Sequence, residues 1–394
     1  MPPKQYRVGI VGFGIAGGAL AILLARAGHA VTLIERAPEV GPVGAGFLLQ
    51  PSGQAVLRRL GLLDGVVQHS EPIYALRAFT AGGRPLVHLR YSGVAPDCYA
   101  YGVHRGVLFE ILHTAIRAEK IPIVLNQHIN DWREEESRVL AVNVRGEVVG
   151  GPFDFLAAAD GSRSTLRQTL NLDQPSRDYD IGAMWAIGYS LQVKQYLHQV
   201  TDGTRHLLGL LPIGGGRCNV FWSLPTDQIE AVRQRGIAAW KEDAVRLSPL
   251  AEAALGNIST FDQVAFTTYR HARPRRTHNE RVVLIGDAAH STSPHLGQGA
   301  NLALLDAECL AAALQKADSP PAAFQDYRRA RASQIRYYSA LSWSLTPFFQ
   351  SEGWVLGAGR DVALPLMSAI PLLRREMEWA MAGRRQGLFQ DSRL

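Results

Sequence analysis

The sequence predicts an α/β protein in which a Rossmann-like domain is interrupted by a mostly antiparallel β-sheet domain and followed by C-terminal helices. Near the N-terminus, an apolar strand at 7–11, a glycine-rich turn, a helical stretch and a second strand at 30–34 follow one another as in a βαβ unit. Residues 181–225 instead alternate apolar and polar side chains, which is typical of an antiparallel sheet with two different faces. From Pro320 onward the composition predicts helix to the last residue.

The glycine-rich turn carries the first chemical signal. Gly12, Gly14 and Gly17 form a GxGxxG pattern directly after the first strand. In a βαβ unit these glycines allow the tight turn, the approach of the backbone to a pyrophosphate, and close helix–strand packing. The second strand ends at Glu35, whose carboxylate would bind an adenosine ribose and repel a 2′-phosphate. We therefore expect an FAD or NAD site rather than an NADP site, formed by Gly12, Gly14, Ile15, Ala16, Gly17, Glu35 and Arg36.

A second glycine-rich segment lies between residues 281 and 307. An apolar strand at 282–285 stops just before Asp287, and Gly297 and Gly299 precede a further helix. A carboxylate at the carboxyl end of a buried parallel strand faces the ligand crevice of such a sheet. Glycines before a helix N-terminus let backbone N–H groups approach an anionic or carbonyl-rich ligand. The segment therefore predicts contact with a large cofactor that carries hydroxyl groups and an electron-poor ring.

Composition narrows the class of protein. A chain of 394 residues, 47% hydrophobic and 19% charged, is typical of a globular protein of about two domains. The three cysteines show no metal-ligand spacing, so we expect no metal site and a reducing, cytoplasmic compartment. The net charge is +6, but aromatic residues are not interleaved with the basic ones, which argues against nucleic-acid binding. We expect neither a signal peptide nor an integral membrane segment; for the apolar tail at 355–373, packing on the protein body is favoured over resting on a membrane surface.

Three motifs in sequence order carry a family resemblance. They are the GxGxxG unit, Ala159-Asp160-Gly161-Ser162-Arg163-Ser164 with Arg167, and Gly286-Asp287 with its continuation Pro294-x-x-Gly297-Gln298-Gly299. With them the chain resembles the single-component FAD-dependent aromatic hydroxylases, the p-hydroxybenzoate hydroxylase-like flavoprotein monooxygenases. Arg105 with Leu108 is similar to the Arg-x-x-Leu that opens the family's flavin-contacting helix. Leu305 departs from the pattern, because the family commonly has an acid there, before the aspartate that corresponds to Asp306.

The resemblance implies a Rossmann-like FAD-binding domain of the p-hydroxybenzoate hydroxylase type with an inserted substrate-binding sheet domain. Residues 1–72, 101–180 and 277–320 would form the FAD-binding domain, 73–100 and 181–276 the sheet domain, and 321–394 a C-terminal helical region. Asp287 would bind a ribityl hydroxyl, Arg105 would reach the pyrophosphate, and Asp160 would hold the arginine-rich motif. The loop at 41–46 would let the flavin move between two positions. Further implied cofactor contacts are Gly46, Gly297, Gly299, Ala300 and Asn301.

The implied activity is aromatic hydroxylation. NADH or NADPH would reduce the flavin as a transient donor, O2 would form a flavin C4a-hydroperoxide, and an electron-rich phenol-like or heteroaromatic ring would attack it in a dry site. Pro294 would lie beside the reacting carbon, and backbone N–H groups near Leu296 and Gly297 would stabilise negative charge on the ring. Alternatives of the same fold are an isoprenoid-chain reductase and a halogenase, although the halogenase signature Trp-x-Trp-x-x-Pro does not occur in the sequence. A non-catalytic flavin- or ligand-binding protein is the alternative from another class.

The substrate pocket is expected on the inserted sheet, between residues 181–225 and 264–270. Candidate lining residues are Trp185, Leu208, Leu210, Phe221 and Trp222, and strand alternation puts about half of them on the opposite face. The catalytic base stays open among Tyr74, Tyr99, Tyr101, His104, Tyr189, His206, Tyr269 and His271, whereas His290 is expected to be structural. Candidates for pairing with a substrate carboxylate are Arg84, Arg90, Arg205 and Arg217. The substrate, the choice between NADH and NADPH, and the choice between monomer and homodimer stay open.

Overall fold

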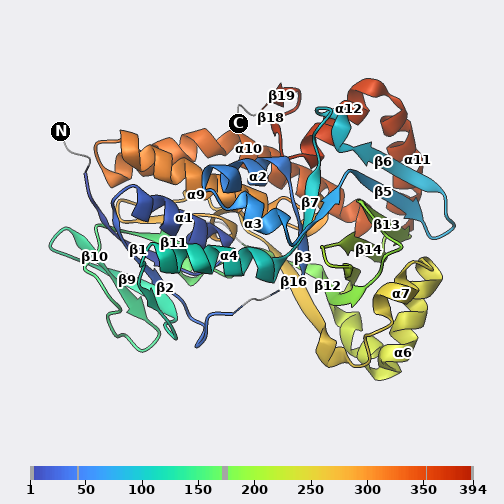
Figure 1. Cartoon of the computed structure of the whole chain (residues 1–394), viewed down its shortest axis with the longest axis horizontal. Coiled ribbons are helices and arrows are strands. Elements are labelled where there is room, and N and C mark those ends of the chain that lie inside the picture. The colour runs from blue at the N-terminus through green and yellow to red at the C-terminus, as the bar shows by residue number, and fades with distance from the viewer. Residues whose placement is uncertain (1–3, 42–43, 171–175, 352, 392–394) are drawn as a thin grey trace.

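The first layer of the molecule is a five-stranded parallel sheet with the strand order β17-β11-β1-β2-β8 (Figure 1). The computed structural model describes all residues except 1–3, 42–43, 171–175, 352 and 392–394. The strands are β1 (Arg7–Val11), β2 (Ala30–Ile34), β8 (Ile123–Val124), β11 (Phe155–Ala158) and β17 (Val282–Leu284). Their side chains are mostly buried, because a parallel sheet is covered on both faces. The predicted βαβ start is confirmed.

Helices cover one face of this sheet and a β-hairpin covers the other. On the helical face lie α1 (Ile15–Arg26), α2 (Pro51–Arg59), α3 (Leu63–Val67), α4 (Arg105–Ala118) and α9 (Gly299–Lys316). The other face packs against β9 (Ile129–Glu135), β10 (Arg138–Asn143) and α5 (Thr165–Thr169). Alternation along β11 serves both faces, since Phe155 joins the helical side and Leu156 the hairpin side.

The second layer is a seven-stranded sheet with the order β16-β12-β15-β14-β13-β5-β6. Its strands are β5 (Ala75–Thr80), β6 (Pro85–Arg90), β12 (Arg177–Tyr189), β13 (Tyr196–Asp202), β14 (His206–Pro212), β15 (Arg217–Pro225) and β16 (Val264–His271). Every pairing is antiparallel except β13 with β5. This confirms the predicted mixture of a parallel and a mostly antiparallel sheet. The proposed domain division at 180/181 falls inside β12 and stays a proposal.

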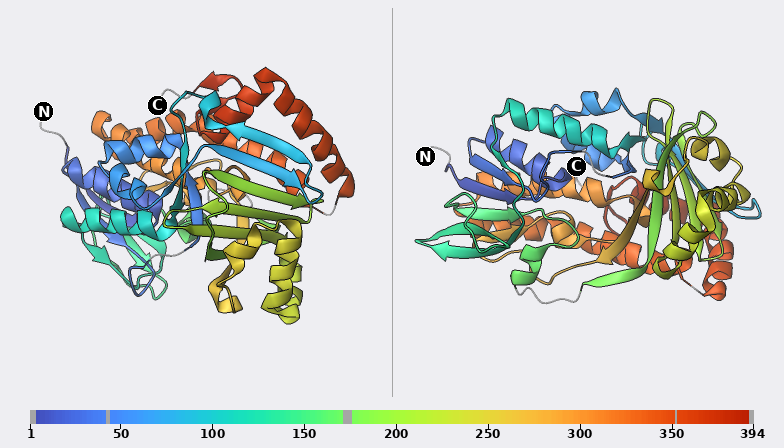
Figure 2. Two further views of the ribbon diagram at one scale, coloured as in Figure 1. Left: turned by 45° about the vertical axis from the view of Figure 1, so that its right-hand side comes forward. Right: turned by 90° about the horizontal axis from the view of Figure 1, so that it is seen from below.

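The two faces of the seven-stranded sheet pack against different elements, helices on one face and a small sheet on the other. Helices α6 (Ile229–Leu247) and α7 (Ala251–Leu255) cover the face that points away from the parallel sheet (Figure 2). The opposite face packs against a small antiparallel sheet made of β3 (Gly46–Leu49), β7 (Ala100–His104) and β4 (Glu71–Ile73). The face that packs against β3, β4 and β7 is therefore the one that meets the parallel-sheet half of the molecule.

The C-terminal region is helical but not to its end. Helices α10 (Pro320–Phe349), α11 (Trp354–Ala369) and α12 (Pro371–Met381) follow one another, and α10 packs along α9. The chain then forms a short hairpin of β18 (Arg385–Gly387) and β19 (Gln390–Asp391). The prediction of helix to the last residue is wrong because Gly383, with a φ of +76°, turns the chain into a conformation that ends α12.

Helix α11 is unusual because it is apolar yet exposed. Only Gly357 and Arg360 are buried among its 16 residues, while Trp354 and Leu366 are 79% and 62% exposed. Taken singly, none of the helices in the described ranges is long and apolar enough to cross a membrane. Helices α11 and α12 meet that test only as a pair, and the pair is bent by 102°.

Three element boundaries differ from the sequence prediction for local reasons. The helical composition of residues 19–27 predicts a helix from 19, but α1 begins at Ile15 and includes Gly17, where a Cβ would lie 2.0 Å from the carbonyl oxygen of Gly12. Helix α2 begins at Pro51, a residue that favours the first helical position. The apolar alternation of residues 139–149 predicts one strand, but β10 ends at Asn143, because Gly146 adopts a φ of +79° in a turn.

Candidate active site

The N-termini of α1 and α9 meet at the carboxyl ends of β1 and β17. A Cβ on Gly286 would lie 2.9 Å from the Cβ of Ala16 and 3.5 Å from that of Ala303, so the three segments are in contact. Neither helix has a side chain that caps its N-terminus. The first N–H groups of a helix have no intrahelical acceptor, and together with the helix dipole they favour an anion. The crevice therefore suits a ligand with phosphate groups and carbonyl oxygens.

The GxGxxG glycines divide into packing positions and an open position. Gly12 has a φ of +103°, and a Cβ there would lie 2.4 Å from the carbonyl oxygen of Ala159. A Cβ on Gly17 would lie 2.0 Å from the carbonyl oxygen of Gly12. A Cβ on Gly14 would meet no atom within 4 Å. Gly12 and Gly17 are thus required by the fold, whereas Gly14 leaves the start of α1 accessible to a ligand.

Glu35 joins the glycine turn to the end of β2. Its Oε2 accepts a hydrogen bond from Phe13 N at 2.7 Å, and its Oε1 accepts one from Ala37 N at 3.0 Å. The carboxylate is half-buried and keeps lone pairs for a further donor, and the neighbouring Arg36 is exposed. A position next to the glycine turn matches the ribose contact expected for Glu35, which stays a prediction.

Asp287 stands at the mouth of the crevice. It is the first residue of α8 (Asp287–His290), it is exposed, and its Oδ1 lies 3.8 Å from where a Cβ of Gly299 would be. A carboxylate beside the first turn of α9 is placed to accept hydrogen bonds from ligand hydroxyls. The predicted neighbours Gly299 and Ala300 form that first turn.

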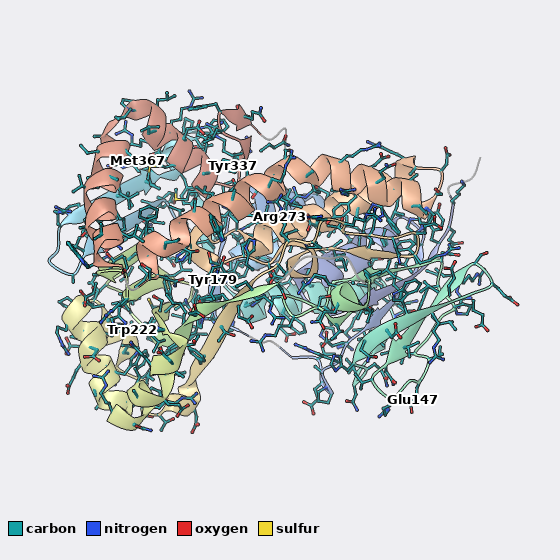
Figure 3. The ribbon with its side chains drawn as sticks, turned by 180° about the vertical axis from the view of Figure 1, so that it is seen from behind. Glu147, Tyr179, Trp222, Arg273, Tyr337 and Met367 are labelled. Atoms are coloured by element: carbon teal, nitrogen blue, oxygen red, sulfur yellow. The ribbon has the colours of Figure 1, made fainter. Side chains whose placement is uncertain are left out.

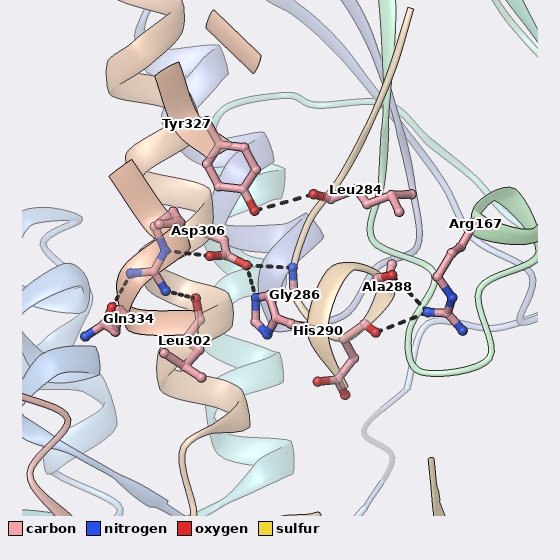
Figure 4. A network of polar contacts seen from close by, with 11 residues as sticks. Arg167, Leu284, Gly286, Ala288, His290, Leu302, Asp306, Tyr327 and Gln334 are labelled. Atoms are coloured by element: carbon pink, nitrogen blue, oxygen red, sulfur yellow. Dashed lines mark hydrogen bonds and ion pairs between the residues drawn. The ribbon is translucent and has the colours of Figure 1, made fainter. Parts of the chain in front are cut away.

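Arg167 connects the two aspartate–glycine motifs. Its buried guanidinium donates to the carbonyl oxygen of Ala288 at 2.8 Å (Figure 4) and to that of Ser162 at 2.7 Å. Burial lowers the pKa of Arg167, and the Asp160 carboxylate partly offsets this. Asp160 itself accepts a hydrogen bond from Thr165 N at 2.9 Å, and burial raises its pKa. Both side chains hold the two motifs in position.

The segment from Pro294 to Gly297 forms a single 3-10 turn, in which the Gly297 N–H already has an acceptor. Gly297 has a φ of +60°, and its N–H donates to the carbonyl oxygen of Pro294 at 2.8 Å. Because this N–H is bonded inside the turn, it is not free for the predicted stabilisation of ring charge. Pro294 is exposed and Leu296 is half-buried, so both side chains are accessible to a ligand.

Asn301 positions this turn rather than facing the crevice. The side chain is fully buried, and its Oδ1 accepts a hydrogen bond from Gln50 N at 2.8 Å. Its amide nitrogen donates to the carbonyl oxygens of Leu48 and Gly297, each at 3.0 Å. Its two amide protons are therefore already donated to protein acceptors, and the side chain ties β3 to the turn. The cofactor contact expected of Asn301 stays a prediction.

Behind the crevice lies a buried charge cluster of His290, Asp306 and Arg331 (Figure 4). Asp306 accepts hydrogen bonds from Gly286 N at 2.9 Å, His290 Nε2 at 2.5 Å and Arg331 Nε at 2.7 Å. Burial alone would raise the pKa of Asp306, but the attraction of His290 and Arg331 outweighs it and holds that pKa well below its usual range. Burial alone would lower the pKa of His290, but Asp306 raises it.

The structural role expected of His290 agrees with this geometry, whereas sequence reasoning assigned Asp306 only a family match and assigned Arg331 no role. The available signal was an aspartate inside the apolar stretch 302–311; Arg331 lies among several other arginines and polar residues, so no signal distinguishes it. The unusual Leu305 lies beside Asp306 in the main apolar core, where it is 5% exposed. The departure from the family pattern therefore adds to the core and leaves the charge cluster intact.

Gly46 and Arg105 lie where the two sheets approach each other. Gly46 N donates to Asn219 Oδ1 at 3.0 Å, and a Cβ on Gly46 would lie 2.6 Å from Ile213 Cγ2. Gly46 thus packs against the seven-stranded sheet, and Asn219 is a contact that sequence reasoning missed. Arg105 is exposed at the start of α4, with its Cδ 2.9 Å from where a Cβ of Gly44 would be. In the predicted moving loop at 41–46, residues 42 and 43 lie outside the described residues.

The five candidate pocket residues separate onto two faces of the seven-stranded sheet. Trp185 and Phe221 are paired across β12 and β15, with ring centroids 5.4 Å apart, on the face toward β3. Leu208, Leu210 and Trp222 are buried on the opposite face, beneath α6 and α7. Strand alternation explains the split, and these three side chains cannot line a pocket on the side of the crevice.

The candidate bases occupy different environments. Tyr269 lies on the Trp185 side of β16, and burial holds its pKa well above the usual range, which the bond with Trp185 partly offsets. His104 caps α4 by accepting from Gly106 N at 3.2 Å. His206 stacks on Trp222, on the face under α6 and α7. The others are either exposed (Tyr74, Tyr189), bonded to each other (Tyr99 and Tyr101) or outside the crevice (His271).

Two of the candidate arginines contact backbone oxygens of the protein. Arg84 donates to the carbonyl oxygen of Asp361 in α11. Arg217 donates through Nε to the carbonyl oxygen of Gly214 at 3.2 Å. Arg90 and Arg205 are surface residues of β6 and of the turn between β13 and β14. None of these contacts is with the crevice. In the described ranges, no group of three or more His, Cys, Asp or Glu side chains has the arrangement of a metal site.

Comparison with known proteins agrees with this geometry. The sequence model of the family described as "FAD binding domain" matches residues 5–336. The chain is 27% identical over 374 residues to Aurachin C monooxygenase/isomerase of Stigmatella aurantiaca, covering 91% of this chain and 94% of the relative. It is 28% identical over 359 residues to 3-amino-4-hydroxybenzoate 2-monooxygenase of Streptomyces cremeus, covering 86% and 84%.

A solved structure extends the comparison. P. aeruginosa PqsL in complex with 2-aminobenzoylacetate superposes with a TM-score of 0.79 at 25% identity, covering 91% of this chain and 99% of PqsL. The uncapped helix N-termini, the open Gly14 and the placement of Asp287 independently fit an FAD molecule. The chain therefore belongs to the FAD binding domain family and, within it, to the p-hydroxybenzoate hydroxylase-like flavoprotein monooxygenases, with FAD as its cofactor.

Proposed function

We propose that the protein hydroxylates an aromatic or heteroaromatic, phenol-like small molecule with O2 and either NADH or NADPH. The observation that carries the proposal is the position of an aromatic sheet face next to the cofactor crevice. Leu48 contacts the Gly297 position and belongs to the same apolar cluster as Phe221. An apolar wall beside the crevice excludes water, which oxygen transfer from a reduced flavin requires.

The protein's own residues bind and orient the cofactor. The first N–H groups of α1, next to Gly14, hold the pyrophosphate, and Asp287 accepts hydrogen bonds from the ribityl chain. Because the Gly297 N–H is used inside its turn, the start of α9 at Gly299 and Ala300 is the better source of N–H groups for the carbonyl edge of the ring. When bound, FAD accepts hydride from the donor and activates O2; the hydroperoxide route stays a prediction.

The substrate ring binds on the face of Trp185 and Phe221. Tyr269 lies on the same face, and since its pKa is raised it stays protonated at neutral pH and donates a hydrogen bond to a substrate oxygen or nitrogen. Two relatives support a ring that carries amino or hydroxyl groups. One is named for 3-amino-4-hydroxybenzoate, and the other was crystallised with 2-aminobenzoylacetate.

The test is oxygen incorporation from ¹⁸O₂ with a panel of aminophenols, hydroxybenzoates and hydroxyquinolines. A substrate stimulates NAD(P)H oxidation and yields a product that carries one ¹⁸O atom. Stoichiometric peroxide without labelled product for every compound contradicts the hydroxylase proposal, and substrate reduction without O2 consumption indicates the reductase. A purified protein that binds no FAD contradicts the cofactor assignment.

Two neighbouring residues offer a matched pair of variants for the pocket. Phe221→Leu changes the face toward the crevice and is expected to raise the KM for the aromatic substrate by about tenfold, since one aromatic contact is lost. Trp222→Phe changes the face under α6 and α7 and is expected to leave kcat/KM within about twofold. Equal effects of the two variants contradict the assignment of the pocket to the Phe221 face.

A further inference from the structure

A cavity of about 650 Å³ lies apart from the crevice, between α10 and the segment that connects β16 to β17. It is on the side of the molecule seen in Figure 3, where Arg273 marks it next to α10. Five of its twelve lining residues are arginines, Arg273, Arg275, Arg328, Arg331 and Arg336, and none is acidic. A concave surface with this charge raises the local concentration of anions.

The arginines of the cavity are only partly neutralised by the protein. Arg331 is buried at its base and paired with Asp306 at 2.7 Å. Arg328 is exposed and donates to the carbonyl oxygen of Arg275 at 3.3 Å, which removes no charge. Within the described ranges, neither Arg328 nor Arg336 forms an ion pair. Both guanidinium groups are therefore available to an anionic ligand at the rim.

Two polar atoms in the wall of the cavity support a ligand independently of the charge. The Thr277 hydroxyl oxygen and His271 Nδ1 are buried and have no hydrogen-bond partner in the described part of the protein. Buried polar atoms are nearly always bonded to protein, water or ligand, because an unmet hydrogen bond is costly. Two residues of the wall therefore have hydrogen-bonding capacity that the protein does not use.

We propose that this cavity binds a phosphate group of a small molecule. Planar guanidinium groups match the oxygen atoms of phosphate in a bidentate manner, and phosphate carries more charge than a carboxylate for the same area. The base of the site touches the cofactor region through protein contacts, because Arg331 holds Asp306 and Asp306 holds the Gly286 N–H one residue before Asp287. The phosphate belongs either to a free phosphate compound or to the nicotinamide donor.

The test is calorimetric titration of pyrophosphate into the FAD-loaded protein, with Arg328→Ala, Arg336→Ala and Arg329→Ala as variants. Arg328 and Arg336 line the cavity, whereas Arg329 lies on the same helix outside it and pairs with Asp326. All three are exposed, so the variants are expected to keep the melting temperature of the wild type. Arg328→Ala and Arg336→Ala should each weaken pyrophosphate binding by about tenfold, and Arg329→Ala by less than about twofold.

Binding should also weaken with added salt, as expected for an exposed charged site. No binding by the wild type, or equal affinity in all three variants, overturns the proposal. Competition between pyrophosphate and NADPH during flavin reduction, with weaker NADPH binding by Arg336→Ala, assigns the phosphate to the donor. Unchanged NADPH binding together with the tenfold loss for pyrophosphate assigns it to a free phosphate compound. These titrations need no hydroxylation substrate, so their failure is distinct from failure of the proposed function.

Discussion

Replacement of Asp306 by asparagine is expected to destabilise the protein strongly. The carboxylate is completely buried and accepts hydrogen bonds from Gly286 N, His290 and Arg331. Asparagine keeps the shape but removes the charge, which leaves the Arg331 guanidinium buried without an anion. Breaking a buried pair by removing one partner costs about 3–5 kcal/mol. Since whole domains are stable by only about 5–15 kcal/mol, this single change removes a large share of the stability.

The assay is thermal unfolding followed by intrinsic and flavin fluorescence. At about 2–4 °C per kcal/mol for a domain of this size, Asp306→Asn should lower the melting temperature by about 6–20 °C. Glu308→Gln is the matched control, because Glu308 lies on the same helix and pairs with Arg59 on the partly exposed side. That pair should contribute less than about 1 kcal/mol. Melting temperatures of the two variants within about 2 °C of each other would refute the reasoning.

The pH dependence of the same variant tests the charge assignment. The pKa of Asp306 is lowered in the folded state, so its stabilisation is present above its unfolded pKa and is lost as pH falls through the folded value. The pKa of His290 is raised, so its stabilisation is present below the unfolded value of 6.5 and is lost as pH rises through the folded value. The wild type should therefore lose this part of its stability on both sides of an intermediate pH. In Asp306→Asn the loss at high pH should disappear; because burial and Arg331 then lower the pKa of His290, the stability of the variant should instead fall as pH drops below 6.5.

Four further predictions follow from single contacts. Gly14→Ala should leave the melting temperature of the FAD-free protein unchanged yet weaken FAD binding by about tenfold or more. Gly17→Ala should instead lower the melting temperature of the FAD-free protein, because a Cβ at Gly17, unlike one at Gly14, meets a backbone atom. Asp287→Asn should weaken FAD binding by about ten- to a hundredfold in a fluorescence titration, and an unchanged affinity would contradict its placement on the ribityl chain. Asn301→Ala should lower stability by about 2–4 kcal/mol in urea unfolding, since it leaves one buried N–H and two carbonyl oxygens unpaired. Burial lowers the pKa of His295 to about 4 against 6.5 in the unfolded chain, so stability should fall as pH drops from 6.5 to about 4, and His295→Gln should flatten this part of the unfolding curve.

The sequence was most informative where local geometry and function demand the same residues. The strand before Gly12, the spacing to Gly17 and the acid at Glu35 predict a βαβ unit, because each residue has a local task that few others fulfil. The amphipathic period of residues 105–118 predicts a helix over that range, and α4 has these bounds. The order of the three motifs was sufficient for the family.

Assignments that depend on contacts between distant segments were less successful. The Gly297 N–H and the Asn301 amide belong to the predicted segment. In the structure, however, the Gly297 N–H is bonded within the turn, and the Asn301 side chain is bonded to Leu48 of β3 and to Gln50. The pocket candidates lie on two faces because side chains alternate along a strand. The sequence shows this alternation, but it does not show which face meets the cofactor domain.

By itself, the sequence determined the fold class, the FAD cofactor and the family, because glycines, strand ends and helix starts carry those signals over a few adjacent residues. Only the tertiary structure decided which face of the inserted sheet points to the crevice, that the Gly297 N–H is bonded inside its turn, and that Asp306 pairs with both His290 and Arg331. It also brought five arginines from two separate segments around one cavity. Such properties depend on which residues lie next to each other in space, and residues far apart in the chain acquire those neighbours only when the layers pack.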